Sequence, residues 1–358
     1  MKKRWTSSVA AVACAIGLVA SAGSAGAATD DPLRSDLWGL DQVRAEQAWS
    51  SSRGEGVVVA VVDTGVDLGH PDLAGRLVPG ADFVCGEVKG SCGDGGWKGQ
   101  DGVGQESDVH GTHVAGTIVG SADNGIGVAG VAPDAKVMPI KVLEDGSGTN
   151  EDIAEGIRYA ADHGADVINL SLGGLPGTQI FSIFGLDTTM KDAIQYARDK
   201  GTLTVAAAGN TSTLLCNDPA FSSDSICVGA TDRNELKSYF SELPVTFRGK
   251  GVAGPGGSGR LLGGPCSDDI ISTVPRGTGT DECGEGKDYA AFAGTSMATP
   301  HVAGVAAILF GQGRSLDNVE QAILSTSRHP VFGTRGGFSA LYGRGIVDAR
   351  AAVAYPRD

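Results

Sequence analysis

The amino-acid sequence predicts an α/β fold: a single three-layer domain whose mostly parallel central sheet carries helices on both faces. Five short runs of apolar or β-branched residues are continuous, as strands buried on both faces require. These runs are 57–62, 136–142, 167–172, 203–207 and 226–230. Segments with helical periodicity lie between several of the runs, and this strand-helix alternation is typical of a parallel sheet.

Two of the helices are predicted by the spacing of their apolar residues. After Thr149, apolar residues recur every four positions at Ile153, Ile157 and Ala161, and Asp152 completes a start that resembles a capping box. A second apolar face has helical spacing and ends in glycine; its members are Met190, Ala193, Ile194, Ala197 and Gly201.

Nothing in the chain resembles a linker or an internal repeat, so one domain is expected. Two glycine-rich stretches, 86–104 and 249–264, are interpreted as surface insertions. We take the 56 glycines as tight turns and close backbone approaches, because apolar runs recur throughout the chain.

The first 27 residues have the order of a secretory signal peptide. Three basic residues precede an apolar stretch, 9–20, and small residues follow up to Ala27. The stretch is shorter than the roughly 20 apolar residues of a membrane span. We therefore expect an exported domain, residues 28–358, that neither spans nor binds a membrane.

The charge of the chain argues against a nucleic-acid partner. Loss of the three basic residues Lys2, Lys3 and Arg4 with the signal would change the formal net charge from −14 to −17. Nucleic-acid binding rests on neutralising phosphates with Lys and Arg. We interpret the acidity as solubility outside the cell.

Seven cysteines become six if Cys14 leaves with the signal. An even number in an exported chain indicates disulfides, and the order along the chain suggests three local pairs. A metal site is the rival interpretation, which the absence of Cys-x-x-Cys disfavours. The expected pairs are Cys85–Cys92, Cys216–Cys227 and Cys266–Cys283.

An aspartate followed by Thr-Gly ends the first strand, in VAVVDTGVD, residues 59–67. Asp63 could be half of a carboxylate pair, the orienting member of a Ser-His-Asp triad, or a turn residue. A carboxylate pair needs a second Asp-(Thr/Ser)-Gly, which this chain lacks. The pair is therefore excluded for a single chain.

Two further stretches fit a triad. DVHGTHVAGT (108–117) offers His110 and His113, and GTSMATPHVAG (294–304) offers Ser296 before a helix of small residues. A serine hydroxyl becomes a good nucleophile when an imidazole takes its proton, and that imidazole needs an anion on its other nitrogen. Spacing alone does not decide which histidine faces the serine.

From about Trp38 to Ala352 the chain resembles the subtilisin-like serine proteases, on these three motifs and on their order Asp, His, Ser. The resemblance implies that Asp63 orients the base and that Ser296 is the nucleophile. It gives the base as the first histidine of His-Gly-Thr-His, His110, and leaves His113 a structural role. The chain departs from the family at Val109, where a glycine is usual.

The resemblance extends to the oxyanion hole. TVAAAGN (204–210) resembles the family's oxyanion segment, so the side-chain amide of Asn210 and the backbone N–H of Ser296 are the expected donors. The helix that follows Ser296 adds partial positive charge. Pro300 lacks a donor, which an early helical turn tolerates.

Two more segments, EDGSGT (144–149) and NLSLGG (169–174), resemble the family's substrate-binding strands. The residues assigned to substrate contact are Gly146, Ser147, Gly148, Ser171, Leu172 and Gly173. One wall of the primary specificity pocket is assigned to Ala206, Ala207 and Ala208. The expected pocket floor, 211–225, departs from the family, so substrate preference is not predicted.

Calcium is implied as a structural cofactor, because SADNGIGVAGVAP (121–133) resembles the family's calcium loop. The alternative is a glycine-rich turn without an ion. Hard cations need several oxygen ligands. The matching positions are Asp31, Asp72, Asn124 and the carbonyls of Ala122, Ile126 and Val128.

The function expected from the sequence is a secreted serine endopeptidase, monomeric, acting on polypeptides. A catalytically silent fold kept as a binding protein is a second hypothesis, and an esterase or peptide ligase using the same triad is a third. The segment between Ala27 and the first strand is short and resembles the family's mature N-terminal arm. No pro-domain is therefore expected.

Overall fold

The computed structural model describes residues 29–84, 108–144, 146–173, 188–260, 265–283 and 285–358. Within this part of the chain a parallel sheet of seven strands runs in the order β2-β3-β1-β4-β5-β6-β7. The strands are β1 (Val58–Asp63), β2 (Ala81–Asp82), β3 (Lys136–Lys141), β4 (Val167–Leu170), β5 (Leu203–Ala207), β6 (Ile226–Thr231) and β7 (Gly251–Pro255). The predicted parallel sheet is confirmed, and all five predicted strands are present.

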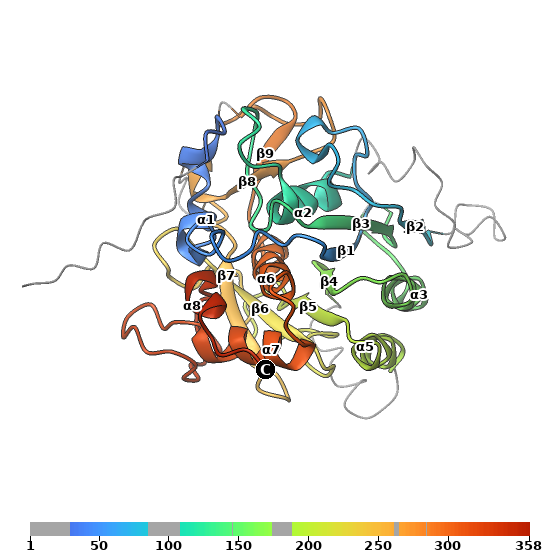
Figure 1. Cartoon of the computed structure of the whole chain (residues 1–358), viewed down its shortest axis with the longest axis vertical. Coiled ribbons are helices and arrows are strands. Elements are labelled where there is room, and N and C mark those ends of the chain that lie inside the picture. Colours follow the sequence, from blue (N-terminus) through green and yellow to red (C-terminus); the bar gives the residue numbers. More distant parts are fainter. Residues whose placement is uncertain (1–28, 85–107, 145, 174–187, 261–264, 284) are drawn as a thin grey trace, which may run out of the picture.

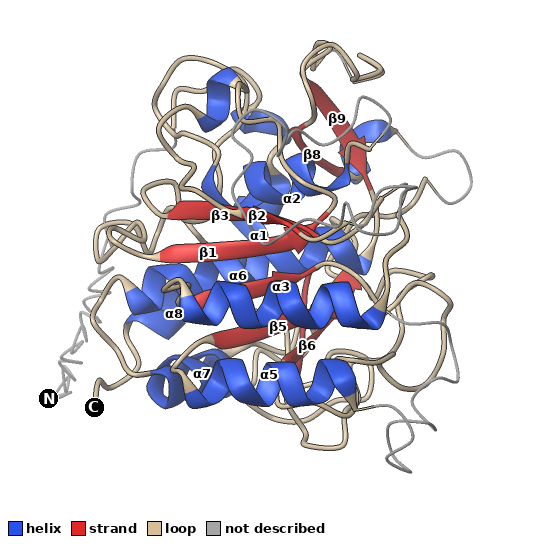
Figure 2. Cartoon of the chain, turned by 90° about the vertical axis from the view of Figure 1, so that its right-hand side faces the viewer, coloured by secondary structure: helices blue, strands red, loops and turns tan. Residues whose placement is uncertain are grey.

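Helices cover both faces of the sheet, as predicted. Figure 2 shows α3 and α5 side by side on the face toward the viewer, with α6 behind the sheet. In β1 the side chains of Val59 and Val61 enter the core on one face, while Ala60 and Val62 enter the core on the other. The helices are α1 (Trp38–Val43), α2 (His110–Val119), α3 (Asn150–Asp162), α5 (Thr189–Asp199), α6 (Thr295–Phe310), α7 (Leu316–Thr326) and α8 (Ala349–Val353).

The two predicted helices begin and end close to the expected residues. Thr149 is the N-cap of α3, and its hydroxyl accepts a 3.0 Å hydrogen bond from the N–H of Asp152. This contact satisfies one of the N–H groups that a helix start leaves unpaired. No helix in the described ranges is long and apolar enough to cross a membrane.

The interpretation of 249–264 as a surface insertion is wrong for its first half. Residues 251–255 form β7, and all five are buried. Glycine is needed there because β7 lies close to its neighbours: a Cβ on Gly251 would lie 1.8 Å from the carbonyl oxygen of Pro244. The other predicted insertion, 86–104, lies outside the described residues.

A two-stranded antiparallel hairpin, β8 (Ile270–Thr273) and β9 (Tyr289–Phe292), packs on α2 outside the main sheet. Figure 1 shows it above α2 and next to the N-terminal segment. The sequence analysis missed this hairpin.

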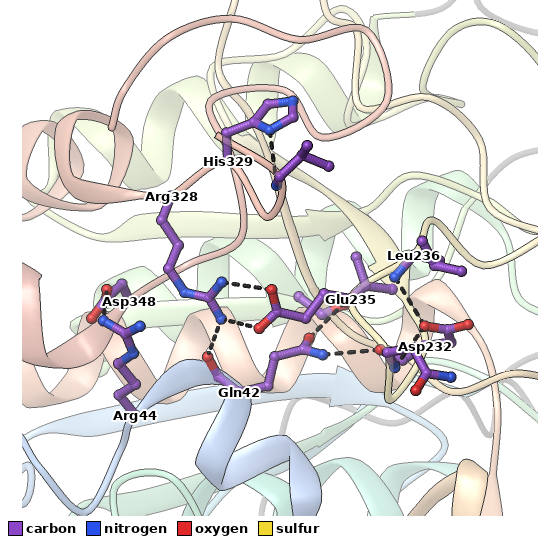
Figure 3. A network of polar contacts seen from close by, with 12 residues as sticks. Gln42, Arg44, Asp232, Glu235, Leu236, Arg328, His329 and Asp348 are labelled. Carbon is purple, nitrogen blue, oxygen red and sulfur yellow. Dashed lines mark hydrogen bonds and ion pairs between the residues drawn. The ribbon is translucent and has the colours of Figure 1, made fainter. Parts of the chain in front are cut away.

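A partly buried polar network joins the C-terminal part of the chain to the loop after β6 and to α1 (Figure 3). Arg328 donates to both carboxylate oxygens of Glu235, at 2.8 and 2.5 Å, and to the carbonyl of Gln42 at 3.0 Å. Beside it, Asp348 accepts from Arg44 at 2.9 Å and from Arg335 at 2.8 Å. These contacts link α1, the loop after β6 and the C-terminal residues beside β7.

Candidate active site

The site residues converge because parallel strands end at one edge of the sheet. Asp63 is the last residue of β1, and Asn210 follows β5. His110 is the first residue of α2 and Ser296 the second of α6, and these two helices pack against each other. Residues far apart in sequence are thus brought to one edge.

Asp63 and His110 are in direct contact: Oδ1 of the aspartate lies 2.7 Å from Nδ1 of the imidazole. Asp63 is completely buried, and the same oxygen accepts the N–H of Thr64 at 2.8 Å. The side chain of His110 is 30 % exposed. The carboxylate therefore fixes one ring nitrogen as the donor and leaves the other free to act as a base.

Two carboxylates determine the basicity of His110. Burial lowers its pKa, but the charge of Asp63, the hydrogen bond to Asp63 and the charge of Asp108 outweigh this and raise the pKa above its usual value. Asp108 is buried and accepts the N–H of His110 at 3.4 Å and that of Gly146 at 3.3 Å. The sequence analysis did not single out Asp108.

The start of α6 is held in place by Ser171. Pro300 is the sixth residue of the helix and has no N–H, so the carbonyl of Ser296 loses its helical partner. The hydroxyl of Ser171 donates to that carbonyl at 2.7 Å, and the amide of Asn169 donates to the hydroxyl at 2.9 Å. The side chain of Ser171 therefore supports the backbone of Ser296, a role that the sequence analysis missed.

Asn210 is oriented by Thr295. Its Oδ1 accepts the N–H of Thr295 at 2.8 Å and the hydroxyl at 3.0 Å, so the Nδ2 amide group remains available as a donor. A Cβ placed on Gly294 would lie 3.6 Å from Asn210 Nδ2 and 3.6 Å from the backbone N of Ser296. The two expected oxyanion donors therefore lie close to one common point.

His113 lies apart from this constellation. It is completely buried, and its Nε2 contacts the carbonyls of Ile270 and Ala290 at 2.9 and 3.2 Å. Burial lowers the pKa of His113 to about 3. A neutral histidine that donates to both strands of the β8–β9 hairpin has the structural position expected for it.

The residues assigned to substrate contact follow β3 and β4 and lie outside the strands themselves. Gly146, Ser147 and Gly148 are exposed, and Ser147 forms a bridge with Glu144. After β4, Leu172 is half-buried and Gly173 is exposed. Both segments leave backbone groups near the triad, where an extended peptide could pair with them.

The three alanines assigned to the wall of the specificity pocket are less exposed to solvent than that assignment predicts. Ala206 and Ala208 are completely buried in the hydrophobic core around α3 and α5, and Ala207 is 3 % exposed. The N–H of Asn217 donates to the carbonyl of Ala208 at 2.8 Å. The assignment of these alanines to a pocket wall stays a prediction.

Two carboxylates lie on either side of the loop that resembles a calcium loop. Asp72 is completely buried and accepts from the N–H of Val128 and from the amide of Asn124, both at 2.8 Å. Asp31 accepts three N–H groups, those of Asp123, Asn124 and Gly125. Neither carboxylate forms an ion pair with a Lys, Arg or His among the described residues.

The donor set around this loop suits a hard cation. Burial raises the pKa of Asp72 to about 6, and the charge of Asp31 adds to the rise. Two neighbouring buried carboxylates without a cationic partner are costly, and a divalent ion would offset that cost. The oxygens of Asn124, Ala122, Ile126 and Val128 are the further ligands that the sequence predicts, and their chemistry suits calcium. The described residues contain no group of three His, Cys, Asp or Glu side chains that could hold a metal ion.

Two of the three expected disulfides are formed. Cys216–Cys227 links the loop after Asn210 to β6, and Cys266–Cys283 links the segment before β8 to the loop before β9. The third expected pair, Cys85–Cys92, lies outside the described residues.

Residues 54–345, which include all of these site residues except Asp31, match the model of the subtilase family, peptidase family S8. The chain belongs to the subtilase family. Among its subtilase relatives, thermitase from Thermoactinomyces vulgaris is 40 % identical over 328 residues, covering 91 % of this chain and 99 % of thermitase. Subtilisin BL from Lederbergia lenta is 38 % identical over 318 residues, covering 88 % of this chain and 98 % of that protein.

Solved structures agree with this membership. A protease from Pseudoalteromonas arctica superimposes with a TM-score of 0.73 at 33 % identity, covering 92 % of this chain and 99 % of the other. Fervidolysin from Fervidobacterium pennivorans gives 0.70 at 32 % identity, covering 96 % of this chain and 48 % of the other. The family and these relatives identify the chain as a serine protease, a hydrolase.

Proposed function

We propose that this subtilase hydrolyses peptide bonds through an acyl-enzyme formed on Ser296. The observation that carries the proposal is the 2.7 Å contact between Asp63 and His110 at the edge of the sheet where α6 presents Ser296. His110 takes the hydroxyl proton as Ser296 Oγ bonds to the scissile carbonyl carbon, and gives the proton to the leaving amine as the C–N bond breaks. Water then attacks the acyl carbon while His110 takes one of its protons. His110 gives that proton to Ser296 Oγ as the acyl C–O bond breaks and the carboxylic acid product leaves.

Negative charge develops on the carbonyl oxygen in both steps. The Nδ2 amide of Asn210 and the backbone N–H of Ser296 are the proposed donors to it, preorganised by the contacts of Thr295. Asp63 stays ionised and stabilises the imidazolium that forms on His110.

The proposed substrates are polypeptides bound in an extended conformation. The exposed backbone of 146–148 and the segment 171–173 would pair with the peptide on either side. The first of these segments is linked through Gly146 to Asp108, and so to the residues that hold the base.

We also propose that the protein is exported by the signal-like segment 1–27, acts as a monomer and binds calcium. Calcium would be held by Asp31, Asp72 and Asn124 with the carbonyls of Ala122, Ile126 and Val128. It would supply positive charge between two buried carboxylates and so stabilise the fold. Asp31 belongs to the N-terminal arm, so the ion would also fasten that arm to the domain.

Labelling with a fluorophosphonate, read by intact mass and peptide mapping, tests the mechanism. Stoichiometric labelling at Ser296, lost in Ser296→Ala, together with hydrolysis of denatured casein, is the expected result. A folded protein that is neither labelled nor active would favour the silent binding fold. Labelling with turnover of esters but not of peptides would favour an esterase.

A further inference from the structure

The segment after Asn210 is held against residues 239–243 by a set of hydrogen bonds. The N–H of Ser212 donates to the carbonyl of Phe240 at 2.8 Å, and the N–H of Leu243 donates to the carbonyl of Thr213 at 3.1 Å. These backbone contacts align the two segments beside the oxyanion residue.

Glu242 holds both chain neighbours of Asn210. Its own N–H donates to the carbonyl of Gly209 at 3.2 Å. Its carboxylate accepts the N–H of Thr211, with 3.0 Å to each oxygen. The residue before Asn210 and the residue after it are therefore both bound to one side chain and its backbone.

The carboxylate of Glu242 accepts several hydrogen bonds from the loop after Asn210. Glu242 is 0 % exposed, and its Oε1 also accepts the hydroxyls of Thr211 and Thr213. Hydrogen bonds to a carboxylate are stronger than those to a neutral acceptor, so this anchor resists displacement. Gly209, before Asn210, has a φ of +113°, and a Cβ there would lie 2.4 Å from Asn217 Nδ2 and 2.9 Å from the carboxyl carbon of Glu242.

We propose that Glu242 is a positioning residue for the oxyanion hole, acting through Asn210. Thr295 fixes the side chain of Asn210, whereas Glu242 fixes its backbone. Donors that stabilise a transition state must be held to within about 0.5 Å, and a loop after a strand does not provide this by itself. The inference rests on the proposed role of Asn210 as an oxyanion donor.

The experiment is a double-mutant cycle with Asn210→Ala, measured on a peptide anilide per titrated active site. Glu242→Ala is expected to lower kcat about tenfold to a hundredfold with KM unchanged, since the oxyanion forms only along the reaction path. Glu242→Gln keeps the Oε1 acceptor but places an amide where Oε2 accepts Thr211, so a smaller loss of about threefold to tenfold is expected. In the Asn210→Ala background, Glu242→Ala should change kcat by less than about twofold.

Glu320→Ala is the matched control. Glu320 is also a buried glutamate, but it lies on α7 and pairs with Arg198 and Lys250. Its loss should lower the melting temperature and leave kcat unchanged.

The remaining outcomes of the cycle separate failure of the role of Glu242 from failure of the role of Asn210. An equal loss of kcat from Glu242→Ala in both backgrounds would overturn the inference, as would unchanged kcat in both Glu242→Gln and Glu242→Ala. A raised KM with unchanged kcat would make Glu242 a substrate-binding residue and also overturn it. If Asn210→Ala itself leaves kcat unchanged, the proposed oxyanion role fails, and the inference fails with it. If Glu242→Ala does not fold, the Glu242→Gln cycle decides alone.

Discussion

The hydroxyl of Ser171 donates to the backbone carbonyl of Ser296 at 2.7 Å, in place of the helical N–H that Pro300 lacks. A proline in a helix interior removes the bond to the carbonyl four residues before it, and that residue here is Ser296, the proposed nucleophile. The gap in the helix is therefore filled by a side chain from the segment after β4. This hydrogen bond joins the proposed nucleophile to a segment proposed to bind substrate.

Ser171→Ala should leave this buried carbonyl without a partner. We expect a loss of roughly 1–3 kcal/mol in the free energy of unfolding. Because the displaced residue is the proposed nucleophile, kcat should also fall, by about tenfold. Thermal denaturation and turnover of a peptide anilide measure the two effects.

Ser272→Ala is the control for this prediction. Ser272 is equally buried and donates to a helix carbonyl, that of His113, at 2.8 Å. The hydroxyl of Thr117 also donates to that carbonyl, at 3.0 Å, so replacement of Ser272 should cost less stability, with kcat unchanged. Equal kcat values in the two variants would show that Ser171 contributes to stability and not to catalysis.

The pH dependence of activity should follow His110. The base works only when neutral, and its pKa is raised by Asp63 and Asp108 against the effect of burial. As pH falls, kcat/KM should therefore begin to drop at a higher pH than an unperturbed imidazole, near 6.5, would give. Asp108→Asn should move this acid limb to lower pH and leave the triad contact in place, as a pH–rate profile would measure.

Asp63→Asn should move the acid limb further and also lower kcat severely, because an amide favours the wrong imidazole tautomer. An acid limb at the same pH in the parent and in both variants would mean that another group controls the profile.

Calcium and protons should compete at Asp72. Its pKa in the folded protein, about 6, lies above its ordinary value, so the folded state holds this proton more tightly than the unfolded state. In chelator, stability from this group should thus be greatest below about pH 4 and fall as pH rises through 6. Added calcium should raise the melting temperature at pH 7, where the carboxylate is ionised.

Asp72→Asn separates this effect from other titrations. The variant should lose the response to calcium and show a smaller decrease of melting temperature between pH 5 and 7 in chelator. If the melting temperature of the parent protein changes with neither chelator nor calcium, the proposed calcium site is wrong.

The disulfides should stabilise the fold by amounts set by their short loops. Cys216 and Cys227 are 11 residues apart, and Cys266 and Cys283 are 17 apart. The double replacement Cys216→Ser with Cys227→Ser should cost about 2–3 kcal/mol in denaturant unfolding. Non-reducing peptide mapping should recover both bonds, and Cys85–Cys92 as the third; a crossed pair would contradict the sequential scheme.

The elements with a strong local pattern were predicted within one or two residues. The runs 57–62 and 203–207 correspond to β1 and β5, because strands buried on both faces are continuous apolar runs. β7 was missed because its glycines are there for close packing, which a pattern of hydrophobicity does not report. The β8–β9 hairpin was missed because long-range contacts with α2 stabilise it.

The site residues divide in the same way, into those that a local sequence motif marks and those that depend on long-range contacts. Asp63, His110, Asn210 and Ser296 stand in motifs, and the structure brings them to one edge of the sheet. Asp108 and Glu242 lie in loops and contact the backbone near the site, and no local sequence motif identifies them. The role of Ser171 left one trace in the sequence: Pro300, four residues after Ser296, leaves a carbonyl that some side chain must satisfy.

The ion pair of Arg44 with Asp348 joins residues 304 positions apart, and the contact of Arg328 with Gln42 spans 286. During synthesis neither contact can form until most of the chain has left the ribosome. Since Ala253 in β7 also forms a bridge with Ile346, the β7 edge of the sheet lacks this bridge until then. A partly made chain therefore lacks the two contacts that join the end of α1 to the C-terminal part of the chain. Residues made late in synthesis thus complete the surroundings of a helix that is made early.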